Sequence, residues 1–142
     1  MLMKAIFLED SYQKEFDANV EMAEVDHIIL GQTAFYPQSG GQPSDTGLLQ
    51  KEDVVFKVVC AKPPEPVHIV DKIGLEAGDR VHGTLDWDRR YRFMRSHTAC
   101  HILSAVIFKE TGSKITGSLL TYLGQESTLA WCPLTKTRWH ST

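Results

Sequence analysis

The sequence has no long apolar run, no surplus of basic charge and no internal repeat, and each absence excludes a class of protein. A membrane-spanning helix needs about 20 predominantly apolar residues, and no segment approaches that length. The N-terminus, MLMKAIFLEDSYQ, becomes acidic before the apolar core of a signal peptide could form, so we expect a cytoplasmic protein. With 15 Lys and Arg against 18 Asp and Glu, the net charge of −3 excludes a protein that coats nucleic acid by bulk charge. Any contact with nucleic acid must therefore be a local patch.

What is present fits an ordinary folded protein of about one domain. The chain has 142 residues, of which 42% are hydrophobic and 23% charged, as in typical globular proteins. This length also permits a division into two small lobes.

The first 85 residues predict a small, mostly antiparallel β-barrel or sandwich. Short apolar runs alternate with turn residues along this part of the chain. The segment KPPEP, residues 62–66, is expected to bound a hairpin because proline lacks the amide donor that a central strand needs. The predicted strands are KAIFL, AEVDHIIL, TAFYP, DTGLLQ, DVVFKVVCA, PVHIVDK and RVHGTLD.

The apolar pattern changes to a helical period at Asp86 or Asp88. It predicts one long helix that begins at an acidic N-cap and ends at Gly112. Beyond it, SKITGSLLTY suits a short strand. The predicted fold is therefore α+β, with a barrel lobe over residues 1–85 and a second lobe, built on the long helix, over residues 86–142.

Within this helix, the sequence HTACH places His97 and His101 on one face, with Cβ atoms about 5 to 6 Å apart. Two imidazoles at this spacing can share a metal ion, although two polar residues on a half-exposed face would give the same pattern. Arg90 lies on the same side of the helix, while the neighbouring arginines point elsewhere. We expect Arg90 to contact a phosphate of an anionic substrate; the alternative is that the basic residues form a solvated helix face.

The second unusual segment is FYPQSGGQPSDTG, residues 35–47. The adjacent Gly40 and Gly41 allow positive φ and a close approach of the backbone, so they can hold Gln42 against a bound ligand. A tight turn between two strands would also explain the glycines. It would not explain the polar Gln42 or the nearby Thr33.

Together, FYPQSGGQPSDTG and the later RSHTACHIL, residues 95–103, resemble the editing domain of alanyl-tRNA synthetase. They are more closely similar to the small free-standing proteins of the AlaX type, which deacylate mischarged alanine tRNA. The resemblance covers roughly residues 4–118. It implies a hydrolase of misacylated tRNA(Ala), chiefly Ser-tRNA(Ala), with Gly-tRNA(Ala) as a second substrate.

The resemblance also implies roles for single residues. His97 and His101 would hold a zinc ion, which lowers the pKa of a bound water to about 7 and steadies the oxyanion of ester hydrolysis. Thr33 would sense the serine hydroxyl, and a site of this kind can reject an analogue that lacks the hydroxyl. The wall of the pocket would comprise Gln42, Gly40 and Gly41.

After the helix the sequence departs from this family. A catalytic zinc takes about three protein ligands, and the Cys-x-x-x-His element that completes the set in the family is absent. The nearest candidates are Cys132 and His140, whose surroundings do not match the family pattern. We therefore expect an incomplete or frame-altered editing protein that departs from the family near residue 119. A rearranged tail, in which Cys132 and His140 complete the site, is the weaker alternative.

Three other interpretations stay open. The chain could be an inactive, truncated remnant that keeps a tRNA-binding surface but has lost metal and catalysis. The tripeptide Gly-Gly-Gln also occurs in release factors, which hydrolyse peptidyl-tRNA without a metal, but here a histidine pair suited to zinc follows it. A generic metal-binding module is the third.

Overall fold

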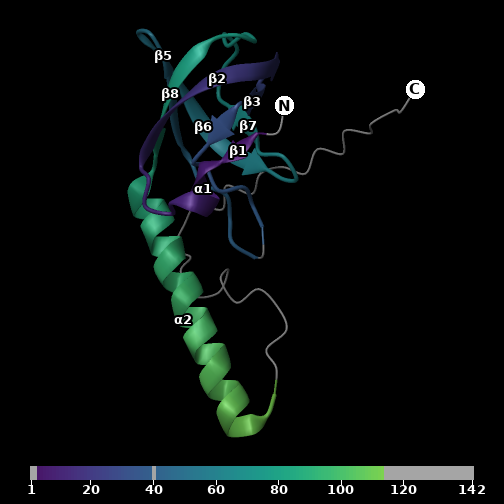
Figure 1. Cartoon of the computed structure of the whole chain (residues 1–142), viewed down its shortest axis with the longest axis vertical. Coiled ribbons are helices and arrows are strands. Elements are labelled where there is room, and N and C mark those ends of the chain that lie inside the picture. The colour runs from purple at the N-terminus through teal and green to yellow at the C-terminus, as the bar shows by residue number, and fades with distance from the viewer. Residues whose placement is uncertain (1–2, 40, 114–142) are drawn as a thin grey trace, which may run out of the picture.

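The computed structural model describes residues 3–39 and 41–113 (Figure 1). Its centre is a closed antiparallel barrel with the strand order β2-β3-β7-β6-β5-β8. The barrel strands are β2 (Glu15–Glu24), β3 (His27–Leu30), β5 (Gly47–Lys51), β6 (Val54–Lys62), β7 (Val67–Val70) and β8 (Arg80–Leu85).

A small group of elements lies beside the barrel, at the end from which the long helix α2 leaves (Figure 1). Strand β1 (Lys4–Ala5) pairs in parallel with β4 (Gln32–Thr33), and the short helix α1 (Ile6–Glu9) follows β1 directly. These elements bring the N-terminal segment next to the start of the Gly-Gly-Gln segment.

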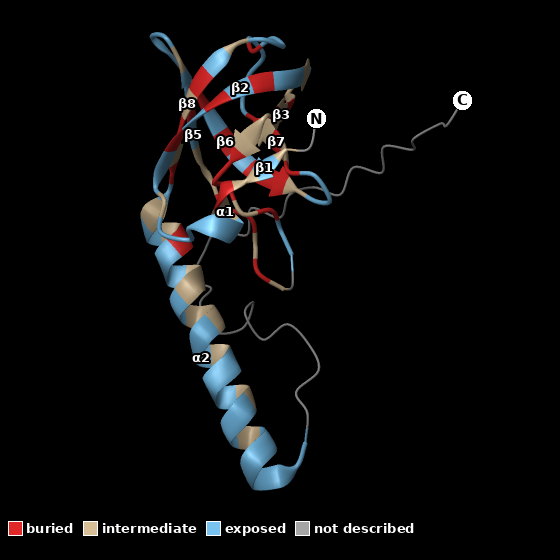
Figure 2. Ribbon diagram, viewed as in Figure 1, coloured by how far each residue is buried: buried red, intermediate tan, exposed pale blue. Residues whose placement is uncertain are grey.

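The barrel closes around an apolar core, which Figure 2 shows as red stretches on the strands. Strand β2 has the period of two that this requires, because Phe16, Ala18 and Val20 point inward between exposed residues. The rings of Phe16 and Phe35 meet edge to face at 5.6 Å. Gly83 on β8 lies opposite Phe16, and a Cβ atom there would come within 2.5 Å of the Phe16 ring.

The α+β class and the barrel agree with the sequence-based prediction, but several strand boundaries do not. Strand β2 was missed over most of its length, because its inward-facing residues are separated by strongly polar ones. AEVDHIIL is not one strand, since the chain turns at Val25, whose φ is 57°. KAIFL is divided between β1 and α1, whereas KPPEP bounds the hairpin from β6 to β7 as predicted.

Helix α2 (Trp87–Thr111) confirms the prediction of one long helix. The side chain of Asp86 accepts a hydrogen bond from the Arg89 amide and caps the first turn. At the other end, Gly112 has a φ of 70° and donates to the Phe108 carbonyl. The chain therefore changes from barrel to helix between residues 85 and 87. The division into two lobes stays a prediction, since most of the second lobe and the strand predicted in SKITGSLLTY lie outside the described residues.

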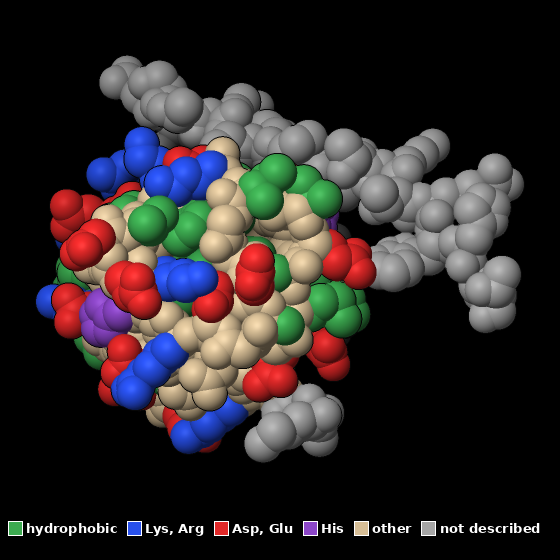
Figure 3. Space-filling model, turned by 90° about the horizontal axis from the view of Figure 1, so that it is seen from above, with side chains coloured by type: hydrophobic (Ala, Val, Ile, Leu, Met, Phe, Trp, Pro, Cys, Tyr) green, Lys and Arg blue, Asp and Glu red, His purple; other side chains and the backbone are tan. Residues whose placement is uncertain are grey.

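The second half of α2 lies away from the barrel and is mostly exposed (Figure 2). Several large apolar residues are among those exposed there. These exposed residues are Ile102, Leu103, Val106 and Phe108. Neither described helix is long and apolar enough to cross a membrane. The far end of the barrel is different, because acidic and basic side chains lie side by side on it (Figure 3). That face offers no continuous basic surface to a polyanion.

Candidate functional site

Gln42 and His97 lie in direct contact, although they are 55 positions apart in the sequence. The Oε1 atom of Gln42 is 3.0 Å from Nδ1 of His97, and Gln42 is only 5% exposed. Because an amide oxygen can only accept, His97 donates from Nδ1, and the neutral ring then carries its lone pair on Nε2. Histidines that bind metals usually have such a partner for the second ring nitrogen.

His101 completes the pair that the helical spacing predicts. Its ring stacks on that of His97, with centroids 4.7 Å apart and planes inclined by 16°. These two imidazoles are only half of a tetrahedral zinc set. Within the described residues, no group of three or more His, Cys, Asp or Glu side chains could hold a metal ion. Cys132 and His140, the predicted further candidates, lie outside those residues.

A tight turn presents Gln42 to the helix. The amide of Gln42 donates to the Ser39 carbonyl at 2.9 Å, and the amide of Ser39 donates back to Gln42 at 3.1 Å. Gly41 has a φ of 79°, which favours glycine, so the predicted need for positive φ is found there. Gly40 lies outside the described residues.

Thr33 is fully buried and binds a residue that the sequence analysis did not single out, His68. The ring of His68 donates from Nδ1 to the Ile28 carbonyl at 3.1 Å, so its Nε2 accepts from the Thr33 hydroxyl at 2.8 Å. The Thr33 oxygen in turn accepts from the Phe35 amide at 3.1 Å. Burial lowers the pKa of His68 to about 4, which keeps the ring neutral at neutral pH.

The structure thus brings Gln42, His97 and His101 together, whereas the Thr33 side chain bonds to His68 and to the Phe35 amide. Among the described residues, no hydrogen bond joins Thr33 to Gln42 or to either histidine of α2. His68 shares the inner face of β7 with Val70, but apolar residues lie on both faces of this strand, so the alternation gave no signal for it.

Arg90 does not lie on the surface, and this corrects the prediction that it contacts a phosphate. It is 2% exposed and forms an ion pair with Asp45, which is 0% exposed. Its guanidinium also donates to the backbone carbonyls of Ser11 and Ala34. The helical period correctly placed Arg90 on the same face as the histidines, but a period cannot tell whether that face packs against other parts of the protein.

The neighbouring arginines differ in exposure. Arg89 is half-buried beside Phe93, and its Nε donates to the Ser44 carbonyl at 3.1 Å. Burial lowers the pKa of Arg89. Arg92 and Arg95 are exposed, as expected of a solvated helix face.

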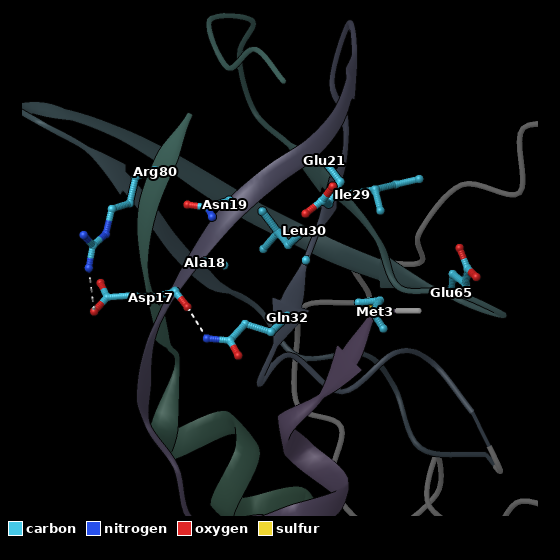
Figure 4. Close-up of a pocket in the computed structure, with 11 residues that line it drawn as sticks. Met3, Asp17, Ala18, Asn19, Glu21, Ile29, Leu30, Gln32, Glu65 and Arg80 are labelled. Atoms are coloured by element: carbon cyan, nitrogen blue, oxygen red, sulfur yellow. Dashed lines mark hydrogen bonds and ion pairs between the residues drawn. The ribbon is translucent and has the colours of Figure 1, made fainter. Parts of the chain in front are cut away.

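A cavity of about 560 Å³ lies on the flank of the barrel, lined mainly by β2 and β3 (Figure 4). Asp17 forms an ion pair with Arg80 at its edge, and its carbonyl accepts a hydrogen bond from Gln32. None of the predicted site residues lines this cavity.

Known proteins match most of this chain. The family model described as tRNA synthetases class II (A) matches residues 2–89. An alanyl-tRNA editing protein AlaX-M from Methanosarcina mazei is 47% identical over 130 residues, which cover 84% of this chain and 52% of that protein. The AlaX-M protein of Saccharolobus solfataricus is 43% identical, over 82% of this chain and 51% of its own. An alanine–tRNA ligase from Thermococcus kodakarensis is 42% identical, over 79% of this chain and 12% of the ligase.

The chain spans about half the length of the AlaX-M relatives that it matches. The family match ends just after the first turn of α2 begins, so it covers the barrel and the Gly-Gly-Gln segment but not the histidine pair. It nevertheless includes more than half of the chain. The protein therefore belongs to the family of tRNA synthetases class II (A), among the members that resemble alanyl-tRNA editing proteins of the AlaX type.

Proposed function

We propose that the protein hydrolyses the ester bond of misacylated tRNA(Ala). The preferred substrate in this proposal is Ser-tRNA(Ala), with Gly-tRNA(Ala) as a second one, and the reaction takes place in the cytoplasm. The contact of Gln42 with His97, beside His101, carries the proposal, because it joins the two segments that resemble editing proteins. The names of the AlaX-M relatives support the choice of tRNA.

The proposed cofactor is zinc, held by His97 and His101. The bond from Nδ1 of His97 to Gln42 supports this assignment, because it leaves Nε2 available as a ligand. Bound zinc would supply a water of lowered pKa and polarise the ester carbonyl. The remaining ligands would come from outside the described residues, where Cys132 and His140 are the candidates.

The protein residues would orient the reacting groups. Gln42 would hold the His97 ring in one tautomer, and Gly41 would let the backbone beside Gln42 approach the substrate closely. Thr33 is fully buried, so its proposed effect on the choice of serine over alanine runs through the segment that it anchors at Phe35.

The test is zinc content and deacylation of the purified protein. We expect about one zinc per chain after dialysis, and the loss of both zinc and deacylation in His97→Ala. His82→Ala is the matched control, since His82 lies on β8 and contacts Asp17 instead. Unchanged turnover of Ser-tRNA(Ala) by the His97→Ala variant would refute the ligand assignment.

A second candidate function is binding of tRNA(Ala) without hydrolysis. It is favoured by the incomplete ligand set, because the described residues supply only His97 and His101. A protein that retains no zinc and leaves Ser-tRNA(Ala) intact, but binds the tRNA, would establish this function in place of the first.

A further inference from the structure

A buried ion pair fastens the segment that carries Gln42 to the helix that carries His97. Arg90 lies near the start of α2 and Asp45 follows Gln42 by three residues. Arg90 donates from Nε to Oδ2 of Asp45 at 2.8 Å, and its NH2 group contacts the same oxygen. Both side chains are almost completely buried.

The guanidinium joins three separate parts of the chain to α2. Besides Asp45, it donates to the carbonyl of Ser11, after α1, and to that of Ala34, after β4. Arginine suits this role because its planar fork presents several donors in fixed directions. Arg90 and His97 are seven residues apart, which is about two helical turns, so they lie on the same face of α2.

Asp45 also closes the segment on itself. Its amide donates to the Tyr36 carbonyl at 3.0 Å, and its Oδ2 accepts from the Tyr36 amide at 2.8 Å. The two ends of residues 36–45 are thereby held together, with Gln42 between them. Oδ2 of Asp45 accepts both from the Tyr36 amide and from Arg90. This one oxygen therefore connects the two ends of residues 36–45 to helix α2.

We propose that Arg90 and Asp45 are positioning residues that set Gln42 against Nδ1 of His97. Stability alone explains the pair poorly, because the desolvation of two charges offsets much of their attraction, and apolar pairs of similar volume are often as stable. What an apolar pair lacks is the set of directional bonds to Tyr36, Ser11 and Ala34. The consequence for catalysis rests on the proposed function. The positions of Arg90, Asp45, Gln42 and His97 do not depend on it.

The experiment compares Gln42→Ala with the paired variant Arg90→Met/Asp45→Leu, using nitrogen NMR of the histidine rings and titration with zinc alone. We expect the paired variant to remain folded by circular dichroism but to lose the single Nδ1-protonated state of His97. Its zinc affinity should fall about 10- to 100-fold, as expected for a lost partner of a metal ligand. Adding Gln42→Ala to it should cause little further loss, because both changes remove the same contact.

A folded paired variant with the His97 spectrum and zinc affinity of the unaltered protein would overturn the proposal, leaving the pair a role in stability alone. If the paired variant does not fold, Arg90→Lys decides. Arg90→Lys keeps the positive charge but not the planar set of donors of the guanidinium, so we expect the NMR signal of Nδ1-protonated His97 to be lost here too. An unchanged signal would refute the proposal that Arg90 positions Gln42. Arg92→Met, at an exposed position, is the control. Failure of the unaltered protein to bind zinc would refute the proposed metal site, while the His97 spectra would still test the positioning.

Discussion

In three pairs of side chains, one member fixes the hydrogen-bonding direction of the other. Gln42 accepts from His97, His68 accepts from Thr33, and Asp45 accepts from Arg90. Such partners restrict a ring or a hydroxyl to one state, which removes alternatives that would weaken binding of a metal or substrate.

Gln42→Ala is expected to lower the zinc affinity of the protein about 10- to 100-fold, because His97 then loses the acceptor that orients its ring. Isothermal titration with zinc measures the change. Gln38→Ala is a suitable control, since Gln38 is exposed and, within residues 3–39 and 41–113, hydrogen-bonds only through its backbone amide, to Ala61. Equal affinities in the two variants would show that Gln42 does not support a metal ligand.

Thr33→Val should reduce the preference for Ser-tRNA(Ala) over Ala-tRNA(Ala), because it keeps the shape of Thr33 but removes the hydroxyl that binds His68 and the Phe35 amide. The ratio of kcat/KM for the two substrates measures this preference. Thr33→Ser retains the hydroxyl and should keep most of it. If the ratio of kcat/KM for the two substrates is the same in Thr33→Val as in the unaltered protein, Thr33 has no role in substrate choice.

Among the larger elements, the turn that carries Gln42 follows β4, and α2 supplies the two histidines. The fit between strands depends on two glycines at close approaches. A Cβ atom on Gly47 would lie 2.2 Å from the Thr84 carbonyl, and one on Gly83 would meet the Phe16 ring. Gly47 therefore permits the pairing of β5 with β8 next to the start of α2, and Gly83 leaves room for the Phe16 ring of β2.

Gly83→Ala should destabilise the protein by about 1–3 kcal/mol, since the added methyl group would overlap the buried Phe16 ring. Urea unfolding followed by circular dichroism measures the loss. In the control Gly31→Ala, the methyl group meets only the flexible end of the Glu21 side chain, and we expect a smaller effect. Similar losses in both variants would contradict the steric explanation.

For the molecule as a whole, the site lies where the Gly-Gly-Gln segment contacts α2. Helix α2 continues away from the barrel (Figure 1). The buried ion pair of Arg90 with Asp45 links the Gly-Gly-Gln segment to α2. Within the barrel, the buried neutral ring of His68 makes the stability of the entire fold depend on pH.

The free energy of unfolding should fall as the pH falls from about 6.5 to about 4. The pKa of His68 is lowered by burial from 6.5 to about 4, so in this range the unfolded chain binds a proton that the folded chain excludes. The protonation of His68 in the unfolded chain lowers the free energy of unfolding by about 3 kcal/mol. This loss is complete once the pH has fallen to about the pKa of His68 in the folded protein. Urea unfolding across this pH range should show that the free energy of unfolding falls more steeply with falling pH in the unaltered protein than in His68→Phe. The variant has no group at position 68 that can be protonated. His82→Ala should behave like the unaltered protein, and a His68→Phe curve of the same slope would contradict the assignment.

Local patterns in the sequence determined much of this protein. The caps at Asp86 and Gly112, together with the helical period between them, predicted α2 and the pairing of His97 with His101. The Gly-Gly pair predicted a turn with positive φ, found at Gly41. These features depend on interactions within a few positions along the chain, and such interactions can be deduced from residue types and spacing.

The surroundings of those residues were decided by the tertiary structure. Arg90 and Asp45 are 45 positions apart, and Thr33 and His68 are 35 apart, so neither contact follows from a local pattern. The sequence predicted a phosphate contact for Arg90 because this residue shares a helix face with His97 and His101, whereas the fold buries it next to a carboxylate. Barrel closure and the docking of α2 bring these distant segments together. The burial and the partners of a side chain depend on how the elements pack against one another. The periodicity of residues along one element does not reveal that packing.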